Sequence, residues 1–229
     1  MREVVLDTET TGLDPAQGHR LVEIACVEVQ DYVPTGRTFH SYLDPERDVP
    51  EEAYRIHGLS RNFLAGKPQF RQVYVEFLEF VDESRLVIHN AEFDMKFVNA
   101  ELQSIGVAAI PMDRAFDTLA YARRKFPGAS NSLDALCARF RIDNSKRTRH
   151  GALLDAEILA EVYIELMGGR QTALELAVNV TKKASIAPSS IAVRQGRLRS
   201  SLDAVSMNEH ESLRMALGPE ALWRRYVDS

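Results

Sequence analysis

The sequence has few of the features that mark exported or membrane-bound proteins. Among its 229 residues are only two cysteines and one tryptophan. Cys26 and Cys137 stand alone in apolar surroundings, without metal-site spacing, so we interpret them as small core residues in a reducing compartment. The apolar run VVL that precedes Asp7 is too short for a secretory signal. No apolar run approaches the ~20 residues that cross a bilayer. We therefore expect a cytoplasmic protein without a membrane partner.

The charge balance gives no simple indication of a partner. A net charge of −5 disfavours nucleic acid, yet the stretch 139–150 carries five Lys and Arg residues against the single Asp143, and 123–125 is Arg-Arg-Lys. Acidic totals are also compatible with nucleic-acid enzymes whose carboxylates hold metal ions, because the ions reverse the local sign of charge.

Apolar periodicity predicts an α/β domain that ends near Gly169. The first strands should form an antiparallel meander, with a turn at Pro-Thr-Gly before the third, and later strands should alternate with helices in a mixed sheet. The expected strands are 3–7, 21–29, 36–44 and 85–90, and the expected helices are 68–83, 91–106, 117–126, 132–140 and 150–169. We place the domain at 1–170.

The remaining sequence differs in composition. Residues 171–201, rich in Ser, Lys, Arg and small side chains, resemble a flexible linker, and 202–229 is expected to carry short helices. Ser206 and Glu209 have capping-box spacing, which predicts a helix over 206–218, and a second short helix over 218–226 holds Trp223.

The first candidate metal-binding residues lie in the stretch LDTETTGLD. Because strand side chains alternate, Asp7 and Glu9 project from one face and Thr8 from the other. Packed carboxylates repel each other unless a divalent cation lies between them, and Mg²⁺ or Mn²⁺ prefers such oxygen ligands.

Two further segments contain residues that could complete the site. Asp94 falls early in a helix that follows a buried strand. His150 and Asp155, five positions apart, would lie roughly 140° apart on one straight helix. They converge only if His150 precedes the helix, and Gly151 fits that boundary. By contrast, Asp113, Asp117 and Asp134 read as ordinary helix-start acids.

Together these residues resemble the DEDDh 3′→5′ exonucleases. The resemblance is closest to the proofreading epsilon subunits of bacterial DNA polymerase III, and it rests on DTETTGL, IHGLS, HNAEFD, the stretch from FPGASNSLDAL to LLDAEILAEVY, and a terminal ALWRR. It implies a ribonuclease H-like fold and hydrolysis at two divalent cations, Mg²⁺ or Mn²⁺. It also assigns roles to the five residues: Asp7, Glu9, Asp94 and Asp155 as metal ligands, and His150 as the base that deprotonates the attacking water.

The same resemblance implies contacts with the terminal nucleotide of a DNA 3′ end. The metal ligands Asp7, Glu9 and Asp155 face it, together with Thr10, Leu13, His57, Asn90 and Phe93. Phe93 and Leu13 could stack or wedge against an unpaired base, although ordinary core packing is an equal reading.

Partner sites are expected in the second part of the chain. Gln171, Leu174 and Leu176 in QTALEL resemble a weak peptide for the sliding clamp, within 171–176. The segment 202–229 resembles the part of epsilon that binds the polymerase catalytic (alpha) subunit. Its candidate contacts are Leu213, Leu217, Leu222 and Trp223. The sequence leaves open whether a small theta-like subunit binds the domain.

Two other functions are alternatives to proofreading. An RNA-trimming DEDDh exoribonuclease uses the same catalytic residues, but such enzymes typically lack this long arm. A non-catalytic scaffold that stabilises the polymerase would not need clustered carboxylates. The resemblance implies release of nucleoside 5′-monophosphates from mismatched 3′ ends.

Overall fold

The computed structural model describes residues 1–147, 149–168 and 203–216. The chain divides into two units, Met1–Leu176 and Ala177–Ser229, and each is described by itself. No helix within the described ranges has the length and apolar character needed to span a membrane. The predicted boundary at residue 170 and the predicted linker 171–201 lie outside these ranges.

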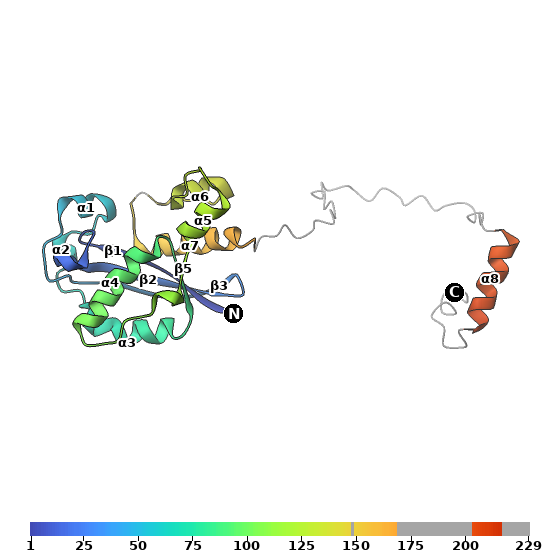
Figure 1. Ribbon diagram of the computed structural model, residues 1–229, viewed down its shortest axis with the longest axis horizontal. Coiled ribbons are helices and arrows are strands. Elements are labelled where there is room, and N and C mark those ends of the chain that lie inside the picture. The colour runs from blue at the N-terminus through green and yellow to red at the C-terminus, as the bar shows by residue number, and fades with distance from the viewer. Residues whose placement is uncertain (148, 169–202, 217–229) are drawn as a thin grey trace, which may run out of the picture. The chain divides into compact units, whose positions relative to one another are not determined.

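A five-stranded mixed sheet forms the centre of the first unit (Figure 1). Its spatial order is β3-β2-β1-β4-β5. The antiparallel pairs β1–β2 and β2–β3 form the expected meander, whereas β4 lies parallel to both β1 and β5. The strands are β1 (Arg2–Thr10), β2 (Leu21–Gln30), β3 (Val33–Tyr42), β4 (Arg85–Ile88) and β5 (Ala115–Asp117). The predicted α/β fold with a mixed sheet is confirmed.

The hairpin between β2 and β3 turns earlier than the sequence suggested. Asp31 and Tyr32 both have positive φ, 51° and 63°, and Pro34 already pairs with Val29. The prediction of a turn at Pro-Thr-Gly was therefore wrong. Two non-glycine residues adopt the left-handed conformation that a tight hairpin requires.

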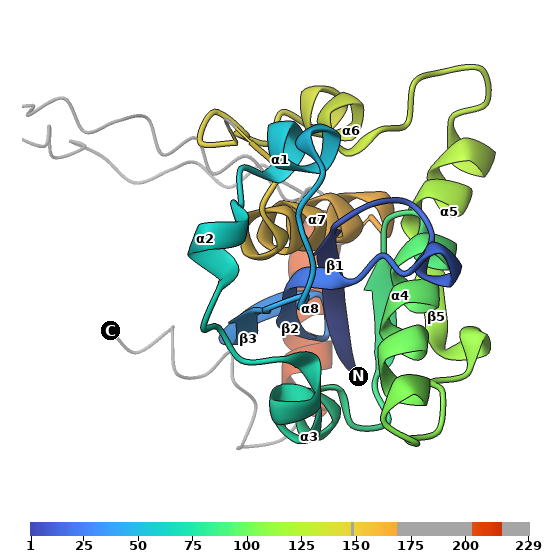
Figure 2. The same cartoon turned by 90° about the vertical axis from the view of Figure 1, so that its left-hand side faces the viewer.

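Helices cover both faces of the sheet (Figure 2). Val4 and Leu6 of β1 pack with residues of α3 and α4, whereas Val5 packs with residues of α6 and α7. Because its side chains alternate between the two faces, β1 contributes to both hydrophobic cores, and the sheet lies between them. The longer helices are α3 (Phe70–Val81), α4 (Ala91–Ser104), α5 (Thr118–Lys125), α6 (Leu133–Phe140) and α7 (Ala152–Leu166).

Two short helices that the sequence did not reveal lie between β3 and α3. They are α1 (Glu51–His57) and α2 (Arg61–Leu64). α1 ends at Gly58, whose φ of 75° is a conformation that side chains rarely adopt. This segment brings His57 to the site described below. The described residues of this unit also form two 3₁₀ turns, η1 (Pro15–Gln17) and η2 (Met112–Arg114).

The second unit contains the helix α8 (Ala204–Ala216). The predicted capping box at Ser206 and Glu209 was wrong, because Ser206 lies within the helix. The carboxylate of Asp203 instead accepts a hydrogen bond from the Ser206 amide at 2.8 Å, which is the role of an N-cap. The expected helix over 218–226 lies outside the described residues.

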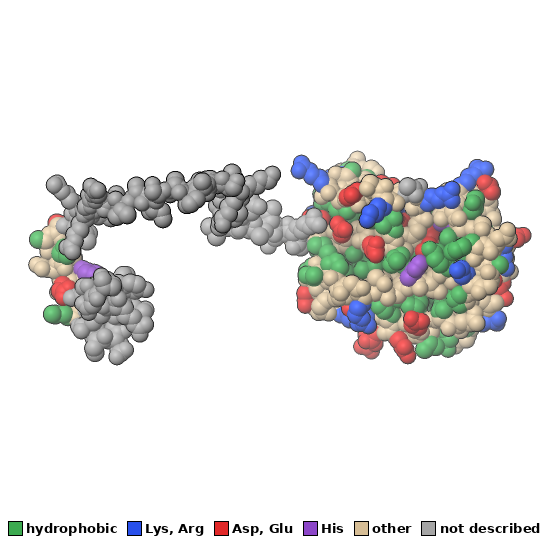
Figure 3. Space-filling view, turned by 180° about the vertical axis from the view of Figure 1, so that it is seen from behind, with side chains coloured by type: hydrophobic (Ala, Val, Ile, Leu, Met, Phe, Trp, Pro, Cys, Tyr) green, Lys and Arg blue, Asp and Glu red, His purple; other side chains and the backbone are tan. Residues whose placement is uncertain are grey.

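Surface charge is mixed on the face of the first unit shown in Figure 3. Acidic, basic and hydrophobic side chains are interspersed there, without a single-sign field over the described atoms.

Candidate active site

β1 carries Asp7 and Glu9 into the layer between the sheet and α7. Both follow Val5 at two-residue steps, and Val5 belongs to the core on the α7 side. Glu9 is 8% exposed. The register with β2 shifts between Glu9 and Thr10, and β1 ends at Thr10, directly after the two carboxylates.

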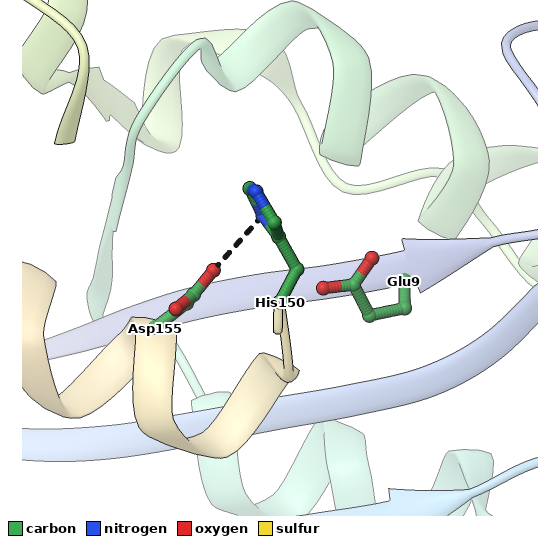
Figure 4. Close-up of side chains that lie close together, drawn as sticks. All are labelled: Glu9, His150 and Asp155. Atoms are coloured by element: carbon green, nitrogen blue, oxygen red, sulfur yellow. Dashed lines mark ion pairs between the residues drawn. The ribbon is translucent and has the colours of Figure 1, made fainter. Parts of the chain in front are cut away.

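The first turn of α7 carries the opposite part of the site. Gly151 is the N-cap, Asp155 is buried in the first turn, and His150 stands before the helix with its side chain 49% exposed. Ligand atoms of Glu9, His150 and Asp155 all lie within 4.8 Å of one another (Figure 4). The Nδ1 atom of His150 is 3.3 Å from Oδ2 of Asp155. A helix that begins after His150 thus brings together two residues that a longer helix would separate.

Asp94 approaches from the other side of β1. It lies in the first turn of α4, and its Oδ1 accepts a hydrogen bond from the Thr8 hydroxyl at 2.7 Å. Thr8 points away from the face of Asp7 and Glu9, so this bond anchors Asp94 to the strand from behind. Asp94 is buried but lies outside the closest group of three.

One cavity of about 1150 Å³ connects these residues. Every residue predicted for catalysis or nucleotide contact lines it: Asp7, Glu9, Thr10, Leu13, His57, Asn90, Phe93, Asp94, His150 and Asp155. Leu13 is 82% exposed at this cavity, so the core-packing reading does not apply to it. Phe93 instead packs against the hydrophobic core and Phe97, with ring centroids 5.1 Å apart.

The carboxylates interact unfavourably when they are charged. Burial and the nearby Asp94 and Glu9 raise the pKa of Asp7 well above its usual value. Burial, followed by the charge of Asp155, raises the pKa of Glu9 to about 8, and burial raises that of Asp94 to about 7. Ordinary protein contacts therefore do not neutralise this cluster.

Asp155 differs from the other three carboxylates in that its pKa is lowered, because Arg147 binds it. Burial alone would raise the pKa of Asp155, but the hydrogen bonds from Arg147 and His150 outweigh burial and lower it. Arg147 also reaches both carboxylate oxygens of Asp134 at 2.9 Å and Nδ1 of His150 at 2.9 Å. The predicted basic cluster thus contains one residue that belongs to the site itself.

The donor set fits hard divalent cations. Within the described part of the chain, the carboxylates of Asp7 and Glu9 accept no hydrogen bond, and their pKa values are raised by burial and by the neighbouring negative charges. Oxygen ligands of this kind bind Mg²⁺ or Mn²⁺, which would remove the repulsion.

The comparisons with known proteins decide the family. Residues 4–163 match the family described as Exonuclease. The chain belongs to this exonuclease family. A DNA polymerase III subunit epsilon from Rickettsia conorii is 56% identical over 179 residues, covering 77% of this chain and 78% of the relative. The Escherichia coli subunit of the same name is 50% identical over 185 residues, covering 77% and 75%.

Solved structures agree with the fold of this exonuclease. Exonuclease X in complex with 5′ overhanging duplex DNA has a TM-score of 0.56 and 27% identity, covering 73% of this chain and 92% of that one. The nuclease domain of 3′hExo, a DEDDh family member bound to rAMP, has a TM-score of 0.64 at 17% identity, covering 74% and 92%. The latter likeness concerns the fold alone. The predicted 3′–5′ exonuclease of the epsilon type is confirmed, and the family depends on divalent metal ions.

Several residues of the exonuclease site were not found from the sequence. His19 lines the cavity beside Gly12, where an added Cβ would lie 2.3 Å from the His19 ring. Glu23 and His40 lie behind the cavity wall, bonded to each other at 2.7 Å. A buried glutamate flanked by apolar strand residues is the one sequence feature that could have indicated Glu23.

The predicted partner residues are mostly beyond the described structure. Leu213 lies in α8 and is 60% exposed. The others lie outside the described ranges: Gln171, Leu174, Leu176, Leu217, Leu222 and Trp223.

Proposed function

We propose that this exonuclease proofreads DNA for a replicative polymerase by hydrolysing the last phosphodiester bond of a mismatched 3′ end. The observation that carries the proposal is the meeting of four carboxylates and His150 in one cavity of about 1150 Å³. Relatives named as subunits of DNA polymerase III support the replicative role.

Two divalent cations, Mg²⁺ or Mn²⁺, are the cofactors that the carboxylates suit. Asp7, Glu9 and Asp155 would hold one ion, and Asp7 with Asp94 would hold the second. When bound, such ions stabilise the attacking and leaving oxygens of an in-line displacement. The chain holds the ligands in fixed positions, because the Thr8 hydroxyl donates a hydrogen bond to Asp94, and because Asp7 and Glu9 lie in β1.

His150 is assigned as the general base. Its Nδ1 lies against Asp155 and Arg147, at 3.3 and 2.9 Å, which orients the imidazole ring. Nε2 lies farther from Arg147, at 3.4 Å, and is the atom that we assign to accept the proton of the attacking water. The exposed side chain can exchange that proton with solvent.

Residues around the mouth of the cavity would hold the terminal nucleotide. Leu13 presents a large exposed apolar surface that can stack on an unpaired base, and stacking of this kind tolerates any sequence. His57 lines the cavity, and its Nε2 is buried without a hydrogen-bond partner in the described residues, which suits a ligand contact. A mismatched end frays more readily and therefore reaches the cavity more often.

The partner proposals concern the second part of the chain. Segment 202–229 would bind the polymerase alpha subunit, and 171–176 would bind the sliding clamp weakly. A small theta-like subunit remains a further candidate for the first unit. A flexible connection would raise the local concentration of the nuclease beside the polymerase. These roles place the protein in the cytoplasm.

The testing experiment uses the purified full chain with Mg²⁺ or Mn²⁺ on 3′-labelled DNA primers, paired and mismatched, and on a matching RNA. We expect metal-dependent release of 5′-monophosphates, faster from the mismatch and slower from RNA. His150→Ala should lower kcat by about 10²–10⁴-fold, whereas His210→Ala on α8 should not.

Two outcomes would replace this proposal. Faster trimming of RNA than of DNA would indicate an exoribonuclease. If no substrate shows metal-dependent release of nucleotides, the protein would be a non-catalytic scaffold.

A further inference from the structure

The N-terminus of α7 is completed by a residue from the sheet. Its N-cap, Gly151, has no side chain to bind the free amides of the first turn. The amide of Ala152 instead donates to Oε2 of Glu23 at 3.1 Å. Glu23 belongs to β2, so the cap comes from a residue that is distant in sequence. A carboxylate at this position also suits the positive end of the helix dipole.

The second oxygen of Glu23 is bound as well. Oε1 lies 2.7 Å from Nε2 of His40 on β3, and the Glu23 side chain is 4% exposed. A buried carboxylate needs such partners, because unpaired burial of its charge is costly. Glu23 therefore joins three elements, β2, β3 and α7, at one point.

This junction determines where the catalytic segment begins. The amide of His150 donates to the carbonyl of Ile56 at 3.2 Å, and the amide of Asp155 donates to the carbonyl of Gly151 at 2.9 Å. The backbone from His150 to Asp155 is thus held at α1 on one side and at Glu23 on the other. Figure 4 shows the side chains of His150 and Asp155 leaving this segment toward each other, beside Glu9.

Glu23 differs from the neighbouring acids in what it contacts. It pairs directly with Glu9 across β1 and β2, so the two side chains share one face of the sheet. Glu9 lines the cavity, but Glu23 is not among the described residues that line it. Because both its oxygens are bonded to protein groups, Glu23 acts through the backbone of α7.

We propose that Glu23, held by His40, is a positioning residue that sets the first turn of α7 and so the distances from Glu9 to His150 and Asp155. The proposal rests on the exonuclease function of the site. It predicts that the pair governs turnover and metal binding while leaving DNA affinity unchanged.

The test compares Glu23→Ala, Glu23→Gln and His40→Ala with the wild-type full chain. Glu23→Ala should lower kcat and weaken Mn²⁺ binding by calorimetry, each by about 10–100-fold, as is usual for outer-shell partners of a metal site. KM for single-stranded DNA should stay within about twofold, since uniform substrate binding is not removed. Hydrogen exchange of the Ala152–Asp155 amides in EDTA should become faster.

Glu23→Gln supplies the rescue. Its amide oxygen can still accept the Ala152 bond, so kcat and amide protection should return most of the way to wild type. His40→Ala should fall between the two. The matched control is Glu28→Ala, which removes another buried, ion-paired carboxylate of β2 outside the cavity. It should lower stability without changing kcat or Mn²⁺ affinity.

The outcomes separate the two claims. Wild-type kcat and amide exchange in Glu23→Ala would overturn the positioning role, and so would equal losses in Glu23→Ala and Glu28→Ala. If Glu23→Ala fails to fold, the ranking of Glu23→Gln above His40→Ala decides. A wild-type chain without nuclease activity would overturn the function alone, because amide exchange still reports on Glu23.

Discussion

Arg147 and Asp155 form a two-point ion pair, with Nε 2.6 Å from Oδ1 and Nη2 2.8 Å from Oδ2. Their side chains are 8% and 3% exposed. Both oxygens of a proposed metal ligand are thus already bonded to a cation of the chain itself. A metal ion that binds Asp155 has to share or displace the guanidinium.

The first prediction concerns this competition. Arg147→Ala should bind Mn²⁺ severalfold more tightly by calorimetry, because no guanidinium competes for Asp155. Its melting temperature in EDTA should fall, since the buried carboxylate of Asp155 loses its guanidinium partner and keeps only His150. Saturating Mn²⁺ should narrow that difference. Lys146→Ala removes an exposed charge from the same loop and should match wild type, while weaker Mn²⁺ binding by Arg147→Ala would contradict the competition.

The second prediction separates catalysis from folding at Asp7. Asp7→Ala should reduce nucleotide release to the level of the EDTA control. Its melting temperature in EDTA should equal or exceed that of wild type. The change removes a carboxyl group whose ionised form is disfavoured by burial and by the neighbouring carboxylates. Asp113→Ala, an exposed acid of η2, should change neither value. A large loss of stability in Asp7→Ala would indicate that this carboxylate is structural.

The third prediction concerns pH. The pKa of Glu9 rises from about 4.5 to about 8 on folding, so between these values the folded chain binds more protons than the unfolded chain. The free energy of unfolding in EDTA should therefore fall as pH rises from 5 to 8. Mn²⁺ needs the ionised carboxylate, so its stabilising effect should grow over the same range.

Thermal melts at pH 6 and 8, with EDTA or Mn²⁺, measure both trends. Glu9→Gln should flatten the slope in EDTA relative to wild type, and Glu76→Gln, an exposed glutamate of α3, should not. Identical slopes for wild type and Glu9→Gln would refute the argument.

The fourth prediction concerns the second part of the chain. Deleting 202–229 should leave 3′ nucleotide release unchanged, because the described cavity is lined entirely from the first unit. The deletion should abolish co-elution with the polymerase alpha subunit in gel filtration. A complex that survives the deletion would remove the assigned role of this segment.

The sequence predicted those parts of the structure that depend on local periodicity. Strand alternation placed Asp7 and Glu9 on one face, and Gly151 marked the start of α7. The hairpin turn was misplaced because Tyr32 is not a residue that usually adopts positive φ, so the pair Asp31-Tyr32 gives no strong turn signal. α1 and α2 are too short, at seven and four residues, to show a clear apolar period.

Long-range contacts could not be predicted in the same way. Arg147 looked like one of several solvated basic residues, and nothing local indicates that it binds Asp155. Likewise, Glu23 lies 129 positions from the amide that it caps. Such pairs are defined only once the sheet and α7 are packed together.

The candidate site draws its residues from two distant parts of the chain: Asp7 and Glu9 lie on β1, whereas His150 directly precedes α7 and Asp155 lies in its first turn. A ribosome adds about 5–20 residues per second. Asp7 and Glu9 are therefore synthesised several seconds before His150 and Asp155. During that interval the nascent chain has no assembled centre, and a product that terminates before His150 lacks both the proposed base and the proposed metal ligand Asp155. The order of the chain thus predicts that a growing or truncated product gains nuclease activity only once His150 and Asp155 are in place.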